Sequence, residues 1–172
     1  MFSALPPEVQ ASIREFRTCE FTTISKSGSP VTWPVSARYL RSLDCFLLTT
    51  SIGLPQKAFN VRRNPKVSLL FSNPYASGLS HPPAVLVQGD AVAPDEIFST
   101  PNATPELREY WLEAIYSRQF ATEMISTNPL MRGLMDWYFM RLVIQITPRT
   151  YFWWPDGDFS RPAQQLEAAH VG

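Results

Sequence analysis

The chain has 172 residues, 45% of them hydrophobic, which suits one globular domain with a sizeable core. Lysine plus arginine (15) balance aspartate plus glutamate (15), so the formal net charge is zero. Such a weak field argues against nucleic acid or an anionic membrane as the main partner. No stretch is long and apolar enough for a membrane span, and the N-terminus lacks the regions of a signal peptide. We therefore expect a cytoplasmic protein.

The chain has only two cysteines and two histidines, and they are not spaced as metal ligands. The two cysteines, Cys19 and Cys45, form no CxxC pair, and each stands where a strand is expected to begin, as a buried small residue. His81 and His170 are the only histidines, and they form no HxxxH or HExxH pattern. These features argue against a metal site built by the protein.

The first third of the chain is predicted to be a helix followed by three strands. Pro6-Pro7 before Glu8 indicates a helix start. Alternation and β-branched residues predict strands over 19–26, 31–40 and 45–51. Pro34 cannot donate a hydrogen bond to a neighbouring strand, so the second strand must be bulged or lie at an edge there.

The remainder alternates between helices and strands. A short helix is predicted over 55–63, with strands over 66–72 and 84–93, the latter with a bulge at Gly89. Predicted after these are a helical insertion over about 94–139, strands over 140–148 and 149–154, and a flexible polar tail over about 156–172. Consecutive hairpin-linked strands with few helices favour a mostly antiparallel barrel with helices packed outside.

One stretch, TTSIGLPQKAFNVRRNPKVSLLF from Thr49 to Phe71, places hydroxyl groups and a lysine at a helix start. Pro55 suits the first helical position, and we expect unpaired backbone N–H groups over 51–54 to attract an anion. Lys57 lies in the first turn and can reach the same anion. The alternative is that the hydroxyls are ordinary helix caps and Lys57 is a solvated surface residue. The residues alone leave both open, although P-loop and Rossmann patterns are absent.

The motifs together resemble the flavin-binding split-barrel family, which includes pyridoxamine 5'-phosphate oxidases and deazaflavin-dependent reductases. The resemblance is carried by FTTISKSGSPVTWPV, CFLLTTSIGLPQKAFNVRRNPKVSLLF and VLVQGDAV, with a weaker match at ITPRTYFWW. It implies a single antiparallel split β-barrel domain over 1–172, of the FMN-binding type. It also implies a homodimer with the cofactor at the interface.

The same resemblance implies a role for particular residues. Residues expected beside the ring are on the second strand. Residues expected at the ring edge and the phosphate end the third strand or lie in the helix after it. Others come from the partner or close the pocket. In chain order they are Trp33, Pro34, Val35 and Ser36 (ring); Thr49, Thr50, Ser51, Gln56 and Lys57 (ring edge and phosphate); Asn60 (ribityl chain or helix); Val87 and Gln88 (from the partner); and Trp153 or Trp154 (closing the pocket). The alternative for the two tryptophans is a barrel plug or a dimer contact.

The leading prediction of function is an FMN-dependent oxidoreductase acting on a small molecule. The alternatives are a reductase dependent on the deazaflavin coenzyme F420 and a non-catalytic flavin- or haem-binding protein, for which His81 or His170 would supply an axial ligand. Vitamin B6 chemistry is disfavoured because the Ser-Arg-Lys run of a true pyridoxamine phosphate oxidase reads Pro55-Gln56-Lys57 here, and Arg161 is the one weak substrate-clamp candidate.

The predicted pocket contains no obvious acid–base residue, which leaves the catalytic residues unassigned. A proton would come from solvent, Ser36 or a residue such as Tyr39. Aromatic residues of the insertion would form either a substrate lid or the buried face of an amphipathic helical pair.

Overall fold

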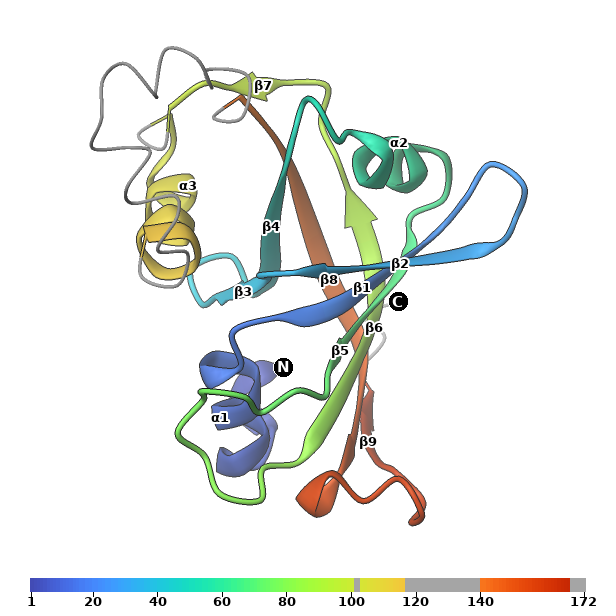
Figure 1. The fold of residues 1–172 in the computed structure, drawn as a ribbon, viewed down its shortest axis with the longest axis vertical. Helices are drawn as coiled ribbons and strands as arrows, with labels where there is room; N and C mark the ends of the chain where they lie inside the picture. The colour runs from blue at the N-terminus through green and yellow to red at the C-terminus, as the bar shows by residue number, and fades with distance from the viewer. Residues whose placement is uncertain (101–102, 117–139, 168–172) are drawn as a thin grey trace.

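The strands form one antiparallel sheet that rolls up because its two end strands are consecutive in the chain (Figure 1). The order is β2-β1-β5-β6-β8-β4-β3, and two residues, Ser36 and Ala37, join β2 to β3. A two-residue link cannot span an open seven-strand sheet, so the ends must approach. No ladder joins β2 and β3 among the described residues, which leaves the barrel split there. The predicted antiparallel split β-barrel is confirmed.

The computed structural model describes residues 1–100, 103–116 and 140–167. Its strands are β1 Cys19–Ile24, β2 Pro30–Val35, β3 Arg38–Leu40, β4 Cys45–Ser51, β5 Lys66–Phe71, β6 Ala84–Val92, β7 Ile97–Phe98, β8 Arg141–Trp154 and β9 Gln164–Glu167. Its helices are α1 Pro7–Glu15, α2 Gln56–Arg63 and α3 Pro105–Tyr110, with a π-helical segment η2 Trp111–Tyr116 and 3-10 turns η1 Phe2–Ala4 and η3 Pro155–Gly157. The helices lie at the periphery of the sheet (Figure 1).

Two apolar clusters result from the alternation of side chains along the strands. Phe21, Phe46 and Leu69 are among the residues that fill the barrel interior, and each is fully buried. On the opposite face of β4 and β8, Leu47 and Val143 pack against α3 and η2 in a second cluster. Because one strand has buried residues on both faces, β4 reads in the sequence as a continuous apolar run.

The cysteines are buried, as predicted. Cys19 and Cys45 are 1% and 7% exposed and begin β1 and β4. Burial raises the pKa of the Cys19 thiol to about 12. Because the thiolate is the reactive form, this cysteine is a packing residue.

The second predicted strand, 31–40, is two strands. Residues Pro30–Val35 pair with β1, whereas Arg38–Leu40 pair with β4 on the other side of the split. The strand that contains Pro34 is an edge strand, as one of the two predicted alternatives required. Apolar and polar residues continue to alternate across residues 36–37. The sequence therefore does not show that the pairing strand changes there from β1 to β4.

The two strands predicted over 140–148 and 149–154 are one strand, β8, and that prediction is wrong. Pro148 lies opposite Gly89, where the register between β6 and β8 shifts. A proline is tolerated at such a bulge because the ladder hydrogen bond is already interrupted. The predicted bulge at Gly89 is confirmed.

The flexible tail predicted over 156–172 is wrong for Gln164–Glu167, which form β9 against β8. Ladder pairing of β4 with β8 ends at Ile146, so the edge of β8 over 150–153 would otherwise be open. An open edge presents unpaired backbone groups, and β9 satisfies them. Residues 168–172 lie outside the described residues.

The predicted helical insertion over 94–139 begins with a strand. Ile97–Phe98 form β7 against β8, and the described helical residues of the insertion are α3 followed by η2. Leu107, Tyr110 and Trp111 are buried on the barrel, which agrees with the amphipathic-helix alternative. Residues 117–139, which make up the remainder of the predicted insertion, lie outside the described residues.

Candidate functional site

The expected phosphate seat lies where β4 ends and α2 begins. Helix α2 starts at Gln56, one residue later than predicted, and Pro55 precedes it in an αR conformation. No side chain caps this helix start. The first backbone N–H groups of a helix have no intrahelical partner and carry the positive end of its dipole. The start of α2 is therefore suited to an anion.

The loop ahead of the helix offers fewer free hydrogen-bond donors to an anion than predicted. The amides of Ile52, Gly53 and Leu54 donate to the Met140 carbonyl (3.1 Å), the Ser51 hydroxyl (3.2 Å) and the Ser51 carbonyl (2.9 Å). The Thr50 hydroxyl donates to the Leu54 carbonyl at 2.7 Å. The prediction of unpaired N–H groups over 51–54 is therefore wrong, because a tight turn satisfies its own polar groups. Thr50 and Ser51 are buried residues that shape this turn.

Lys57 is the predicted residue best placed to meet an anion. Its ammonium lies 5.1 Å from the centre of the Trp33 ring, within range of a cation–π interaction. Burial, and then the charge of Arg141, lower the pKa of Lys57 below its usual range. A lowered pKa means that the folded protein disfavours the charged ammonium. An anion bound beside Lys57 would relieve that cost.

Arg141 is a site residue that the sequence reasoning missed. It begins β8 directly opposite Ser51 of β4, and it is 6% exposed. Its guanidinium lies 5.6 Å from the centre of the Trp111 ring. The sequence did hold a signal, because Arg141 lies at the start of the apolar run MRLVI. An arginine buried in a strand usually has a partner there. Lys57 thus lies beside Trp33 and Arg141 beside Trp111, and the charge of Arg141 acts on Lys57.

The end of β2 is held in position by contacts from two other elements. The Tyr110 hydroxyl of α3 donates to the Ser36 carbonyl at 3.0 Å. The buried Arg38 side chain donates to the carbonyls of Ala37 (2.8 Å) and Phe16 (3.3 Å). Trp33 and Val35 alternate with exposed Pro34, so both lie on the face that meets the barrel interior. The end of β2, which was expected to lie beside the cofactor ring, is therefore held in place where the barrel is split between β2 and β3.

Asn60 holds the helix in place. It is fully buried, and its amide donates to the Thr23 hydroxyl of β1 at 2.9 Å. Its side-chain oxygen accepts from Gln56 at 2.8 Å and also from Arg63. Asn60 therefore ties α2 to the sheet, and Gln56 is held through it. Of the two roles expected for Asn60, this is the one of holding the helix.

Replacing Asn60 with alanine is expected to destabilise the fold by about 2 kcal/mol, because buried partners lose their hydrogen bonds. In a domain of this size that lowers the melting temperature by about 4–8 °C. Asn73→Ala is the control, since Asn73 is exposed and accepts one hydrogen bond, from the Tyr75 amide. Equal melting temperatures for the two variants would contradict the assigned role of Asn60.

Gln88 and Trp153 lie away from Lys57 within one chain. Gln88 is exposed on the outer face of the sheet, in a hollow that Lys66 and Arg149 also line. Trp153 stands 12 residues along β8 from Arg141, which is about 40 Å of extended strand. One protomer therefore does not bring Trp153 to the seat, and Trp153 lines a different cavity.

Neither Tyr39 nor Tyr110 is poised to give up a proton. The Tyr39 hydroxyl donates to the Asp44 carboxylate, and burial together with this bond raises the pKa of Tyr39. Burial also raises the pKa of Tyr110, partly offset by hydrogen bonding to Thr49. Among the described residues, no cluster of three or more His, Cys, Asp or Glu side chains is arranged to hold a metal ion. No described helix is long and apolar enough to cross a membrane.

The rolled antiparallel sheet with its split defines the chain as a split-barrel protein. Its sequence matches the pyridoxamine 5'-phosphate oxidase family over residues 5–154, and the chain belongs to that family. A search of curated protein sequences found no significant match.

Solved structures share the fold at low sequence identity. One is General Stress Protein 26 from Bacillus anthracis, at 15% identity and a TM-score of 0.56, covering 94% of this chain and 96% of that one. A haem-binding protein from Mycobacterium smegmatis has 15% identity and a TM-score of 0.58, covering 95% and 59%. An F420 reductase has 13% identity and a TM-score of 0.53, covering 86% and 98%. These likenesses establish the fold alone.

Proposed function

We propose that this protein is an FMN-dependent oxidoreductase that holds the cofactor phosphate between Lys57 and Arg141 at the start of α2. The observation that carries the proposal is the position of Lys57 at the uncapped start of α2, half-buried beside Trp33, where burial and then the charge of Arg141 lower its pKa. Like charges are brought together in a protein at a cost, and a phosphate dianion would offset it. The uncapped helix start adds backbone donors on the same side.

The remaining residues fit the aromatic part of the cofactor. Trp33 is half-buried beside Lys57, and Tyr110 and Arg38 fix the backbone at Ser36 and Ala37. When bound, FMN would supply hydride and one-electron chemistry. The protein would then orient the ring against β2 and restrict the access of water. No described side chain in the seat is arranged as an acid or base, so protons would come from solvent or substrate.

F420 is the second candidate cofactor, since it also carries a phosphate and an aromatic ring system, and an F420 reductase shares the fold. Haem is less well supported. His81 lines a cavity of about 180 Å³, whereas pockets for larger ligands run to about 300–1,000 Å³. Because a haem-binding protein shares this fold, haemin is included in the titration described next.

Titration of the purified protein with FMN, with F420 and with haemin distinguishes these candidates. Visible absorption and cofactor fluorescence report binding in each case. Saturable binding of FMN is expected. Binding of F420 alone would assign the protein to the reductase branch, and binding of haemin alone would make it a haem protein. Binding of none would contradict the proposed phosphate seat.

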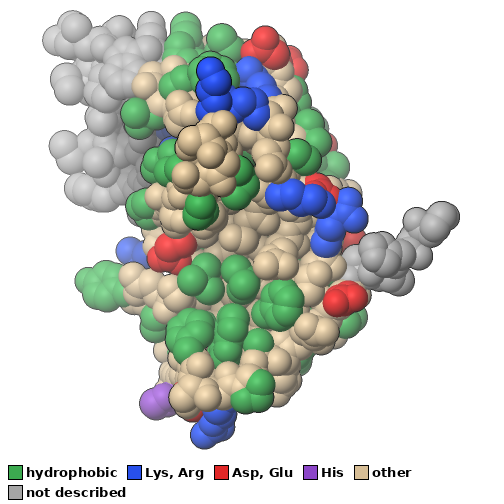
Figure 2. Space-filling view, turned by 90° about the vertical axis from the view of Figure 1, so that its right-hand side faces the viewer, with side chains coloured by type: hydrophobic (Ala, Val, Ile, Leu, Met, Phe, Trp, Pro, Cys, Tyr) green, Lys and Arg blue, Asp and Glu red, His purple; other side chains and the backbone are tan. Residues whose placement is uncertain are grey.

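We propose that a second copy of the chain completes the cofactor site. Gln88 is expected to contact the cofactor, but within one protomer it lies on the outer sheet face away from Lys57. The partner would therefore have to supply it. The outer face carries a cross-strand row of half-buried apolar side chains, Leu70, Leu86 and Phe152, in direct register. A polar row, Ser68, Gln88 and Thr150, runs beside it. Figure 2 shows one face of the molecule on which hydrophobic side chains gather below and basic side chains lie above a central hollow.

Phe152→Glu is therefore expected to convert a homodimer to a monomer, because a charge would be placed in the apolar centre of the interface. Light scattering after gel filtration measures the mass. Tyr75→Glu, a change at a side chain 79% exposed in a loop, is the control and should leave the mass unchanged. A wild-type chain that elutes as a monomer would contradict the proposed interface.

A further inference from the structure

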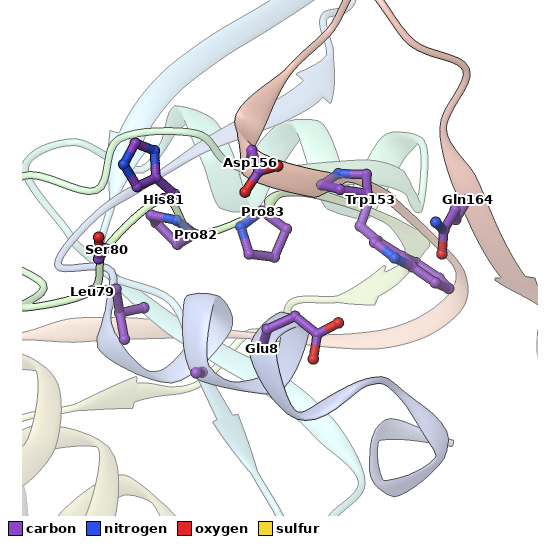
Figure 3. A pocket seen from close by; sticks show the side chains of 11 residues that line it. Glu8, Leu79, Ser80, His81, Pro82, Pro83, Trp153, Asp156 and Gln164 are labelled. Atoms are coloured by element: carbon purple, nitrogen blue, oxygen red, sulfur yellow. The ribbon is translucent and has the colours of Figure 1, made fainter.

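A second cavity lies between α1, the loop over 79–83 and the end of β8, away from Lys57 (Figure 3). Its volume is about 180 Å³. It is lined by Glu8 and Ala11 of α1, by Leu79, Ser80, His81, Pro82 and Pro83, and by Trp153, Pro155, Asp156 and Gln164. An apolar cavity of about 150 Å³ accommodates a benzene ring. This cavity therefore suits a ligand of about that size.

The charges that line the cavity are acidic. Glu8 and Asp156 are both exposed to it, and no lysine or arginine is among the lining residues. Neither carboxylate forms an ion pair with any residue in the described part of the chain. In Figure 3 they approach from opposite sides of Pro83. Two carboxylates beside an apolar surface favour a cation over a neutral or anionic ligand.

The rest of the lining is mostly apolar, and its polar members are Ser80, His81 and Gln164. Trp153 belongs to the barrel core with 8% of its surface exposed, and it forms part of the cavity wall. Leu79, Pro82 and Pro83 add apolar surface without hydrogen-bond donors. A tryptophan face attracts organic cations through its quadrupole, an attraction that strengthens when the cation loses water. The combination of indole, proline and carboxylate groups selects for a cation with an apolar shell.

The walls of the cavity are held by the fold. The buried Ser12 hydroxyl of α1 donates to the Pro83 carbonyl at 2.9 Å. Trp153 pairs with Gln164 in the β8–β9 ladder, so these two lining residues are fixed relative to each other. A site that is formed before binding loses little conformational entropy when a ligand enters.

We propose that this cavity binds a small organic cation, a tertiary or quaternary ammonium group of about the size of choline. The cation would lie against Trp153, and Glu8 and Asp156 would balance its charge. This site is separate from the cofactor site proposed above and does not depend on it.

Isothermal titration of the full chain with choline, and with its neutral analogue 3,3-dimethylbutanol, tests the proposal. The two probes share one shape and differ in charge, so any preference reports the electrostatic contribution. Choline is expected to bind at least about tenfold more tightly. Equal affinities, or no detectable binding of choline, would overturn the proposal.

The double variant Glu8→Gln/Asp156→Asn locates the site. Both side chains are exposed, so the fold should survive, and choline affinity should fall about tenfold. Glu96→Gln, which removes an exposed carboxylate that is not among the lining residues, is the control and should change nothing. Undiminished choline binding in the double variant would place the cation elsewhere and overturn the assignment. FMN titration of the same variant should be unaffected, which separates this result from the proposed cofactor site.

Discussion

Replacing Lys57 with alanine is expected to weaken FMN binding about 10- to 100-fold while the protein stays folded. The ammonium at the start of α2 would make a charge-assisted hydrogen bond to the cofactor phosphate, worth about 1.5–3 kcal/mol. Arg141 and the helix amides would remain, so binding is weakened and not abolished. Fluorescence titration of FMN measures the change. Riboflavin, which lacks the phosphate, should bind wild type and variant alike.

The lowered pKa of Lys57 also predicts how its replacement affects the stability of the cofactor-free protein. A lysine pKa that is lowered in the folded state means that the unfolded chain binds the proton more tightly. The resulting penalty on folding is present below the folded pKa and is relieved as pH rises from there to the ordinary lysine value. Lys57→Met should therefore leave the cofactor-free protein at least as stable as wild type at neutral pH, while it loses FMN affinity.

Lys26→Ala is the matched control for charge, because Lys26 is exposed in the turn between β1 and β2. It should leave FMN affinity unchanged. The phosphate assignment to Lys57 would fail if Lys57→Ala and Lys26→Ala bound FMN equally well. A large loss of melting temperature in Lys57→Met would show that the lysine has a structural role that its lowered pKa does not indicate.

Replacing Gly89 with alanine is expected to destabilise the barrel by about 3 kcal/mol, the largest stability effect among these variants. A Cβ atom at this position would lie 2.4 Å from the Thr147 carbonyl oxygen, which is backbone and cannot rotate away. Relief requires the β6–β8 ladder to separate at the bulge. The melting temperature should fall by about 6–12 °C, measured by circular dichroism.

Gly78→Ala is the control for Gly89, since it tests backbone conformation without a clash. Gly78 has a φ of +75° and no heavy atom within 4 Å of an added Cβ. Its replacement should cost about 1 kcal/mol, from the left-handed backbone alone. If Gly89→Ala were no more destabilising than Gly78→Ala, the close approach of β6 and β8 would not be a constraint on this fold.

Much of the local structure could be predicted from the order of residues alone. The apolar runs and alternations of β1, β4, β5 and β6 indicate strands whose observed bounds differ from the predicted ones by at most two residues. Gly89 signals a bulge, and Pro55 signals the start of α2 to within one residue. These features depend on neighbours within a few positions, which a sequence displays directly.

Tertiary structure decided which distant residues share a site. Arg141 reaches the start of α2 only because β8 pairs with β4, some 90 positions earlier in the chain. Asn60 binds Thr23 across 37 positions, so its role in holding α2 is invisible to local pattern. Trp153 lines a cavity with Glu8, and it stands 12 residues along β8 from Arg141, so one protomer does not bring it to the start of α2. Such contacts follow from strand order and from the split between β2 and β3, which no single segment of the chain encodes.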